Sequence, residues 1–475
     1  MKINRKRLEI NEKVKDSNFL IKILFLIFIV LFQLIFKLYL HKFNPKLSKI
    51  IKNNQINKLN NKIIIIGFYD VIHCDRKWRR VKKGYFNDLP KYTNKFRWVF
   101  LAKNGIDSQC NNFTHLTFSP AENYKNLEKA VIKYKIDIII QNEDESVKEQ
   151  NYLLTLKKKY GTKLIQIMHE YYFFFLIHRG IIDNYNVKWK PIKNFDVILS
   201  SVPCQIYMYH LQQLNIGIYL PQLLPFEYQD IVPSKLEKKN ILMIGRISTE
   251  KKYELGIKAM PYIIKKFPDA MLNIIGGFNY YTKSLIILAQ SLNVSNNVKF
   301  YDLQQDLRPF YSNSSLYFMT SCSESFSFVL AEAKAYGLAN IVTGKEYLVL
   351  TKKGTIIVKD NDYVEMANEA IKLFSNNTYL KEQGKAARDS LVDFLTEKVE
   401  LRYIDLYESL MNGTSKKFLD EEYKKYINET ESLIDLKNSL ELAKRNNYNK
   451  FHCLKFEDFL RPFENIHISF CNEEK

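Results

Sequence analysis

Two glutamates separated by a mostly apolar segment are the first candidates for chemistry in this chain. Glu324 and Glu332 lie in SCSESFSFVLAEAKAYG, residues 321–337, directly after the strand-like run LYFMT. FVLAEAKAYG predicts a helix that ends at Gly337, and at a rise of about 1.5 Å per residue the carboxylates are roughly 12 Å apart. The acid and base of a glycosidase lie only roughly 5 to 9.5 Å apart. The spacing therefore argues against an acid–base dyad and suits the two ends of one elongated ligand. Hydroxyls that can cap the helix come from Ser321, Ser323 and Ser325.

A nucleotide sugar has the matching layout of sugar, diphosphate and ribose. In this hypothesis Glu324 accepts hydrogen bonds from sugar hydroxyls, and Glu332 binds the ribose. Backbone N–H groups at a helix N-terminus bind anions such as phosphate. Here they belong to Phe326, Ser327, Phe328 and Val329. The alternative is a capping carboxylate followed by an exposed helix glutamate, because E-x7-E also arises by chance.

A loop far upstream favours the ligand hypothesis. Gly245, Arg246 and Lys251 directly follow the predicted strand NILMIG, residues 240–245. Glycine allows a ligand close to the backbone, and the two cations can neutralise phosphate. A loop of this kind suits a diphosphate leaving group.

Taken in order, these motifs resemble the donor-binding domain of the group 1, or family 4, glycosyltransferases. The family's Gly-Arg followed five residues later by Lys matches Gly245, Arg246 and Lys251. Its Glu-x7-Glu matches the two glutamates, and GKAARDSLVDFLTEK (384–398) resembles its closing helical region. The resemblance implies an α/β fold of two Rossmann-like domains facing across a cleft, the GT-B fold, and sugar transfer from a nucleotide-diphosphate sugar with retention of configuration. It further implies that Arg246, Lys251 and Glu324 are catalytic, with no metal and no cofactor besides the nucleotide-sugar co-substrate.

The chain departs from the family at a few positions. Ser325 and Ser327 stand where the family usually has Gly, Lys252 replaces a common Gly, and Ala339 replaces Pro. A serine near the phosphate narrows the approach of the donor. Two alternatives stay open for this reason: another GT-B-like enzyme, such as a nucleotide-sugar epimerase or a phosphorylase-type enzyme, and a catalytically inactive scaffold that binds a nucleotide sugar.

Short Ile-rich runs between longer mixed segments predict buried parallel strands that position these residues. The runs are KIIIIG (62–67), RWVFL (97–101), KIDIII (135–140), KLIQIM (163–168), FDVILS (195–200), NILMIG (240–245), MLNIIG (271–276), LYFMT (316–320) and ANIVT (339–343). His169 follows one of these runs, and the resemblance implies that it is catalytic through contact with the transferred sugar or its leaving group. A histidine packed among the neighbouring aromatic residues is the alternative.

The pattern divides the chain into seven parts. We expect a basic tail (1–18), a transmembrane anchor (19–40), a linker (41–61), an N-terminal Rossmann-like acceptor domain (62–225), an interdomain linker (226–239), a nucleotide-sugar donor domain (240–405) and a helical C-terminal extension (406–475). The extension is highly charged, and its pattern favours a solvated helical tail, with a helical extension that packs back on the body as the alternative.

Charge and hydropathy indicate a membrane rather than a nucleic acid as partner. The net charge is +20, and residues 1–62 hold 14 Lys or Arg against 3 acidic residues. FLIKILFLIFIVLFQLIFKLYL (19–40) is long enough to span about 30 Å of hydrocarbon, with a cleaved signal peptide or a buried helix as alternatives. We therefore predict a single-pass membrane protein whose catalytic domain faces the cytosol. An endomembrane is one location that this prediction includes.

A basic loop near the first strand is a candidate contact of the acceptor. The resemblance implies that this region helps to receive the acceptor. We expect the loop to contact a glycan or lipid-linked acceptor bearing phosphate, or the bilayer surface, with a solvated loop as the alternative. The residues are Arg76, Arg79, Arg80 and Lys82. The 6 cysteines of the chain have no metal-ligand spacing, which favours buried free thiols.

Overall fold

The structure is a computed structural model, and it describes residues 63–70, 96–104, 117–142, 147–169, 192–211, 214–224, 226 and 228–446. The chain divides into two units, Met1–Lys62 and Ile63–Lys475, and all described residues belong to the second. Within them no helix is long and apolar enough to cross a membrane. The predicted anchor at 19–40 and the predicted acceptor-contact residues Arg76, Arg79, Arg80 and Lys82 lie outside the described residues.

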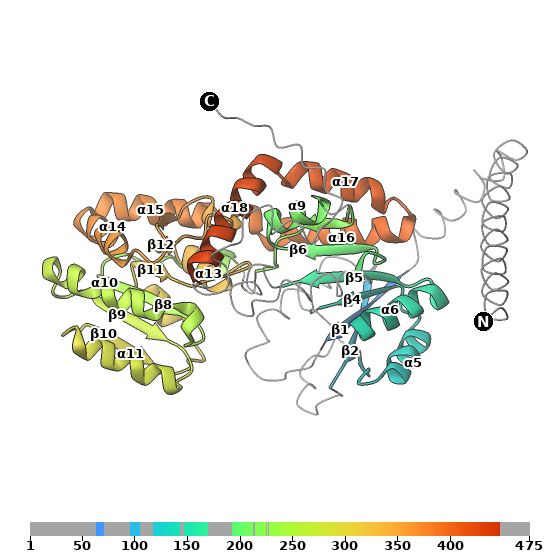
Figure 1. The fold of residues 1–475 in the computed structure, drawn as a ribbon, viewed down its shortest axis with the longest axis horizontal. Coiled ribbons are helices and arrows are strands. Elements are labelled where there is room, and N and C mark those ends of the chain that lie inside the picture. The colour runs from blue at the N-terminus through green and yellow to red at the C-terminus, as the bar shows by residue number, and fades with distance from the viewer. Residues whose placement is uncertain are drawn as a thin grey trace, which may run out of the picture. The chain divides into compact units, whose positions relative to one another are not determined.

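The first half of the second unit forms a parallel sheet of 7 strands in the order β3-β2-β1-β4-β5-β6-β7. Described helices connect β3 to β4, β4 to β5 and β6 to β7 (Figure 1), as expected of parallel neighbours. The strands are β1 (Ile64–Asp70), β2 (Phe96–Ala102), β3 (Thr117–Pro120), β4 (Ile138–Gln141), β5 (Lys163–Met168), β6 (Val197–Ser200) and β7 (Gly217–Tyr219). The helices are α5 (Tyr124–Tyr134), α6 (Val147–Tyr160) and α9 (Pro203–Leu211). The central strands are buried on both faces, which explains why they are continuous apolar runs.

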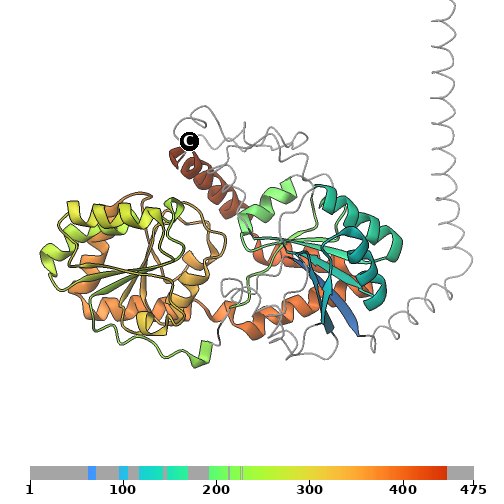
Figure 2. The same cartoon turned by 90° about the horizontal axis from the view of Figure 1, so that it is seen from below.

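A second parallel sheet of 6 strands has the order β10-β9-β8-β11-β12-β13. Helices cover both of its faces (Figure 2), the doubly wound arrangement. The strands are β8 (Asn240–Ile244), β9 (Met271–Ile275), β10 (Val298–Tyr301), β11 (Leu316–Met319), β12 (Ala339–Thr343) and β13 (Ile356–Val358). The helices are α10 (Tyr253–Lys266), α11 (Tyr280–Ser291), α12 (Arg308–Ser312), α13 (Phe328–Ala335), α14 (Tyr363–Ser375) and α15 (Asn377–Asp389). The strand order reverses between β8 and β11, and such a switch point is where doubly wound sheets bind ligands.

The predicted strands are confirmed, and so is the α/β class with two Rossmann-like domains. Two of the cysteines, Cys204 and Cys322, are among the described residues, and both are buried free thiols as expected.

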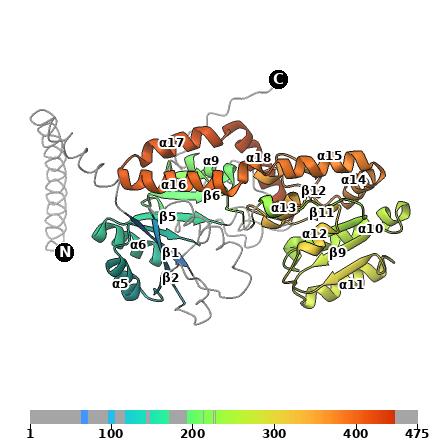
Figure 3. The same ribbon diagram turned by 180° about the vertical axis from the view of Figure 1, so that it is seen from behind.

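The C-terminal helices return to the first sheet. They are α16 (Thr396–Asn412), α17 (Ser415–Tyr426) and α18 (Glu429–Asn446), and α16 and α17 lie along that sheet in Figures 1 and 3. Tyr407 of α16 packs edge-on against Phe96 and Trp98 of β2, at centroid distances of 5.6 and 6.0 Å. The predicted boundary at residue 405 therefore falls inside a helix that belongs to the first core.

The prediction of a solvated C-terminal tail is wrong for the described part of that segment. Leu419, Ile427 and Leu436 are buried in the two large hydrophobic cores. A buried ion pair also holds α16 and α17 together, because Arg402 donates to Glu422 Oε2 from Nε (2.9 Å) and from one Nη atom (2.6 Å). The same guanidinium donates to the carbonyl of Tyr219 in β7 at 2.7 Å. The prediction failed because it was based on the high charge of the segment, although apolar residues recur in it at helical spacing.

Candidate functional site

A cavity of about 270 Å³ opens at the carboxyl ends of β8 and β11, at the switch point of the second sheet. It is enclosed by the loop after β8, by β11 and by the turn that leads into α13. Its lining comprises Met243, Ile244, Gly245, Arg246, Lys251, Tyr253, Tyr317, Phe318, Met319, Thr320, Ser321, Glu324, Ser327, Phe328 and Val329. The Gly-Arg/Lys loop and the Glu-x7-Glu segment both contribute to this lining, although Lys251 and Glu324 are 73 positions apart in the sequence.

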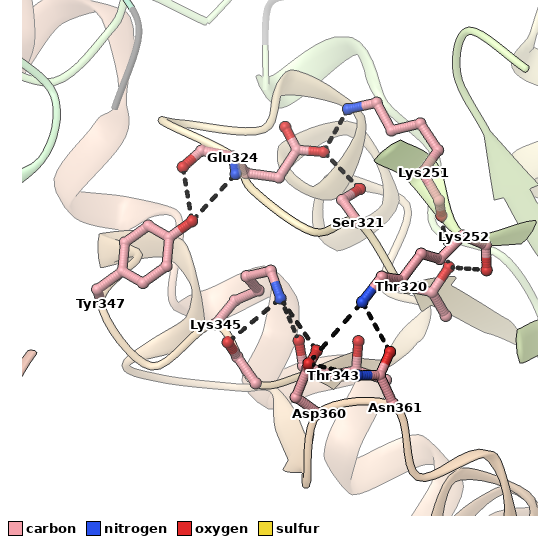
Figure 4. A network of polar contacts seen from close by, with 11 residues as sticks. Lys251, Lys252, Thr320, Ser321, Glu324, Thr343, Lys345, Tyr347, Asp360 and Asn361 are labelled. Atoms are coloured by element: carbon pink, nitrogen blue, oxygen red, sulfur yellow. Dashed lines mark hydrogen bonds and ion pairs between the residues drawn. The ribbon is translucent and has the colours of Figure 1, made fainter. Parts of the chain in front are cut away.

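The centre of the cavity wall is an ion pair between Lys251 and Glu324. Lys251 Nζ lies 2.5 Å from Glu324 Oε1, and Ser321 Oγ donates to the same oxygen at 2.7 Å (Figure 4). Thr320 Oγ1 donates to the carbonyl of Lys251 at 2.7 Å, which ties the β8 loop to the end of β11. Both charged side chains stay partly exposed, at 23% and 15%, so a ligand can reach them.

Glycines let the loop after β8 approach the sheet closely. A Cβ atom on Gly276, after β9, would overlap the carbonyl oxygen of Gly245. A Cβ on Gly245 itself would lie 3.1 Å from the Tyr253 hydroxyl. The loop then turns through the short 3-10 helix Thr249–Lys251, which points Lys251 back toward β11.

Arg246 lies on the rim of the cavity. Its side chain is 71% exposed and is ion-paired with Glu250 in the same loop. A guanidinium at this exposure remains free to exchange that carboxylate for a phosphate, because surface ion pairs are weak.

The helix that follows Glu324 starts at the residue that the sequence predicted, but none of the predicted serines caps it. α13 begins at Phe328, and its N-cap residue Ser327 has φ = 67°, in the left-handed region. The prediction that Ser321, Ser323 or Ser325 caps this helix is wrong: Ser321 donates to Glu324 instead, and the Ser327 hydroxyl donates to Met319 Sδ. Phe328 and Val329 of the first turn of α13 line the cavity. The N–H groups of a first helical turn have no partner within the helix.

Two residues that were predicted to bind the nucleotide-sugar donor lie outside the cavity lining. Phe326 is 2% exposed and packs against Phe328 and Phe394 with centroids 5.3 and 5.9 Å away. Glu332 is 8% exposed, and the Tyr311 hydroxyl donates to its Oε2 at 2.6 Å. Neither is among the residues that line the cavity.

His169 lies at the carboxyl edge of the first sheet in a chain of hydrogen bonds. Its Nε2 is 2.7 Å from Asn142 Oδ1, and Gln222 Nε2 is 3.4 Å from its Nδ1. Asn142 Nδ2 donates to Asp70 at the end of β1, which turns its Oδ1 toward the histidine. An acceptor on one ring nitrogen and a donor on the other hold the imidazole neutral, and burial lowers the pKa of His169 to about 4. Asp70, Asn142 and Gln222 were not predicted from the sequence, although Asp70 ends β1 and Asn142 directly follows β4, at the switch point of their sheet.

Residues 226–390 match the family model of the group 1 glycosyl transferases. This segment is a group 1 glycosyltransferase domain. It contains the cavity, the Lys251–Glu324 pair and α13.

Curated relatives match parts of the chain. An uncharacterized glycosyltransferase from Haemophilus influenzae is 29% identical over 170 residues, which are 35% of this chain and 48% of that protein. Mannosylfructose-phosphate synthase from Agrobacterium fabrum is 32% identical over 116 residues, 22% of this chain and 26% of that protein. The chain thus spans about half or less of the length of these relatives.

Solved structures extend the likeness to both sheets. Sucrose-phosphate synthase from Thermosynechococcus elongatus superposes with a TM-score of 0.58 at 15% identity and covers 74% of this chain and 100% of its own. HepE from Anabaena, solved with UDP-glucose, has a TM-score of 0.57 at 14% identity and covers 73% of this chain and 100% of its own. At this identity the likeness shows a shared fold, and its coverage takes in both sheets of this chain.

Two departures of this glycosyltransferase domain from its family keep a glycine-like backbone. Lys252 has φ = 47° and Ser327 has φ = 67°, both in the left-handed region where the usual glycine has no steric cost. The chain therefore preserves the turn geometry at both ends of the cavity despite the larger side chains.

Proposed function

We propose that the chain is a glycosyltransferase that moves a sugar from a nucleotide-diphosphate sugar to an acceptor hydroxyl with retention of configuration. The observation that carries the proposal is the Lys251–Glu324 pair beside the first turn of α13, inside a group 1 glycosyltransferase domain. A cation, a helix N-terminus and a carboxylate in one cavity match the diphosphate and sugar parts of such a donor. UDP-glucose bound to the HepE neighbour agrees with this donor class.

In the proposed mechanism the protein stabilises the charge that develops on the leaving diphosphate. Lys251, Arg246 and the N–H groups of the α13 N-terminus face the phosphates, and the helix dipole adds to their effect. Glu324 exchanges Lys251 for sugar hydroxyls and orients the sugar. The acceptor hydroxyl then attacks from the face that the diphosphate leaves, and its proton passes to the departing phosphate oxygen. These cations take the role that a metal ion plays in other transferases, so the proposal includes no metal or further cofactor.

His169 remains a proposed contact of the sugar or its leaving group. Because both ring nitrogens have partners within the protein, such a contact requires release of the longer hydrogen bond, from Gln222. Glu332 likewise reaches a ribose only by releasing Tyr311.

The acceptor side of the proposal rests on sequence. Three points remain predictions: the acceptor is a glycan or lipid-linked molecule bearing phosphate, a single-pass anchor spans 19–40, and the basic loop contacts the acceptor. The residues of that loop are Arg76, Arg79, Arg80 and Lys82. A cytosolic catalytic domain held at a membrane would place the basic loop close to anionic headgroups.

The activity is tested by incubating the purified full-length chain with a panel of nucleotide-diphosphate sugars and measuring release of the nucleoside diphosphate. We expect release from one donor or a few related donors, faster when the acceptor is present. Conversion of the donor to another nucleotide sugar without release would indicate an epimerase. Binding without any turnover would indicate a scaffold.

A further inference from the structure

A tyrosine outside the cavity lining holds the main chain of Glu324 on both sides. The Tyr347 hydroxyl donates to the carbonyl of Glu324 at 2.9 Å and accepts the N–H of Glu324 at 3.0 Å. Figure 4 shows the ring reaching Glu324 from the side opposite the carboxylate. We propose that Tyr347 is a positioning residue that fixes Glu324, and with it the Lys251–Glu324 pair, for binding the nucleotide-sugar donor.

Glu324 needs such a partner because it belongs to no regular element. It lies in the turn between the end of β11 at Met319 and the start of α13 at Phe328. No strand ladder or helix supplies partners for its N–H and carbonyl, and buried backbone groups are otherwise satisfied. One tyrosine hydroxyl satisfies both, while Ser321 and Lys251 hold the carboxylate. The backbone and the side chain of Glu324 are thus fixed independently of each other.

Tyr347 can serve as a fixed support because its own position is determined by packing. It is 3% exposed and belongs to the buried core of the glycosyltransferase domain. Burial raises the pKa of Tyr347, so the hydroxyl keeps its proton and remains a donor. A single protonated hydroxyl can both donate and accept here.

The turn that carries Tyr347 is secured by a buried amine. Lys345, which follows β12, is 0% exposed, and its Nζ donates to the carbonyls of Thr343 (2.8 Å) and Gly344 (3.2 Å). Thr351 Oγ1 donates to the carbonyl of Lys345 at 2.6 Å, which closes the turn around Tyr347. The backbone on either side of the tyrosine is therefore anchored to the sheet.

The hydrogen bonds and ion pairs around Lys345 extend to the loop that carries Lys251, the partner of Glu324. Asp360, after β13, lies 3.6 Å from Lys345 Nζ and 3.9 Å from the Nζ of Lys252, the neighbour of Lys251. Lys252 also donates to Asn361 at 2.7 Å. The turns after β8, β11, β12 and β13 are joined into one polar network (Figure 4), and Tyr347 is the member that bonds the main-chain N–H and carbonyl of Glu324.

The test is Tyr347→Phe in the full-length chain, which removes the hydroxyl and keeps the ring in the core. We expect the KM for the donor to rise about tenfold and the KM for the acceptor to stay unchanged, because Tyr347 supports only Glu324, which binds the donor in the proposed function. We also expect amide hydrogen exchange to become faster in a peptide that contains Glu324. The matched control is Tyr403→Phe, which removes a buried hydroxyl bonded to the carbonyl of Pro221 beside the first sheet; its donor KM should equal that of the wild type.

The outcomes separate this proposal from the function on which it rests. An active Tyr347→Phe enzyme with wild-type donor KM and unchanged exchange at Glu324 would overturn the positioning role, whatever its melting temperature. If the wild type turns over no donor, the proposed function fails and the role in catalysis with it. In that case faster exchange at Glu324 in the variant, with weaker binding of a nucleoside diphosphate, would still support the positioning of the site.

Discussion

Replacing Lys251 with methionine is expected to lower the rate of nucleotide release by about 100-fold, or ~2.7 kcal/mol of transition-state stabilisation. Methionine keeps the length of the apolar stem and removes the one cation that the structure places 2.5 Å from Glu324. In the proposed mechanism this ammonium moves to the diphosphate as its negative charge grows. The loss should therefore appear in kcat as well as in donor affinity, and steady-state kinetics with the preferred donor would measure both.

The control for this variant is Lys283→Met, on the exposed surface of α11. It removes the same charge from the same domain away from the cavity, so its rate should stay within a factor of two of the wild type. A loss below about tenfold for Lys251→Met would contradict a transition-state role for this residue.

Replacing Arg402 with methionine is expected to lower the free energy of unfolding by about 3 kcal/mol. Arg402 is 14% and Glu422 is 9% exposed, so the variant leaves a carboxylate buried without its cation. It also removes the bond to the carbonyl of Tyr219 and the stacking on Tyr426, whose ring centroid lies 3.6 Å from the guanidinium. Urea unfolding followed by circular dichroism would measure the loss.

Two further variants show whether the unpaired carboxylate is the cause. Arg402→Met combined with Glu422→Met should recover much of the loss, because no buried charge then remains. Lys398→Met, on the same helix, breaks an exposed pair with Asp393 whose atoms are 3.6 Å apart and should cost less than about 1 kcal/mol. Equal losses for the exposed and the buried pair would contradict this explanation.

The sequence predicted the interior of each sheet better than its edges. The strands that it missed are β3, β7, β10 and β13, and each lies at the edge of a sheet. β10, with VKFY, has one buried residue in four, and β13 has three residues. β3 and β10 are incompletely buried, and β7 and β13 have 3 residues each, so none of the four has the long apolar run that marks a central strand.

The candidate site was predicted where sequence motifs follow neighbouring strands. Lys251 and Glu324 meet because β8 and β11 are adjacent at the switch point, which the strand-end positions of both motifs implied. Glu332 differs although the start of α13 was predicted, because its carboxylate accepts from Tyr311, and no motif marks the position of Tyr311 relative to this helix. Tyr347 could not be found from the sequence, since its role depends on a turn after β12 that no motif marks.

The central claim is that this cavity binds the diphosphate of a nucleotide sugar, and an experimental structure of the full-length chain with the nucleoside diphosphate of its donor tests it most directly. The account predicts the phosphates within hydrogen-bond distance of Lys251 Nζ and of the backbone N–H groups that begin α13, with the Glu324 carboxylate released from Lys251. A nucleotide bound at another place, with the Lys251–Glu324 pair intact, would contradict it.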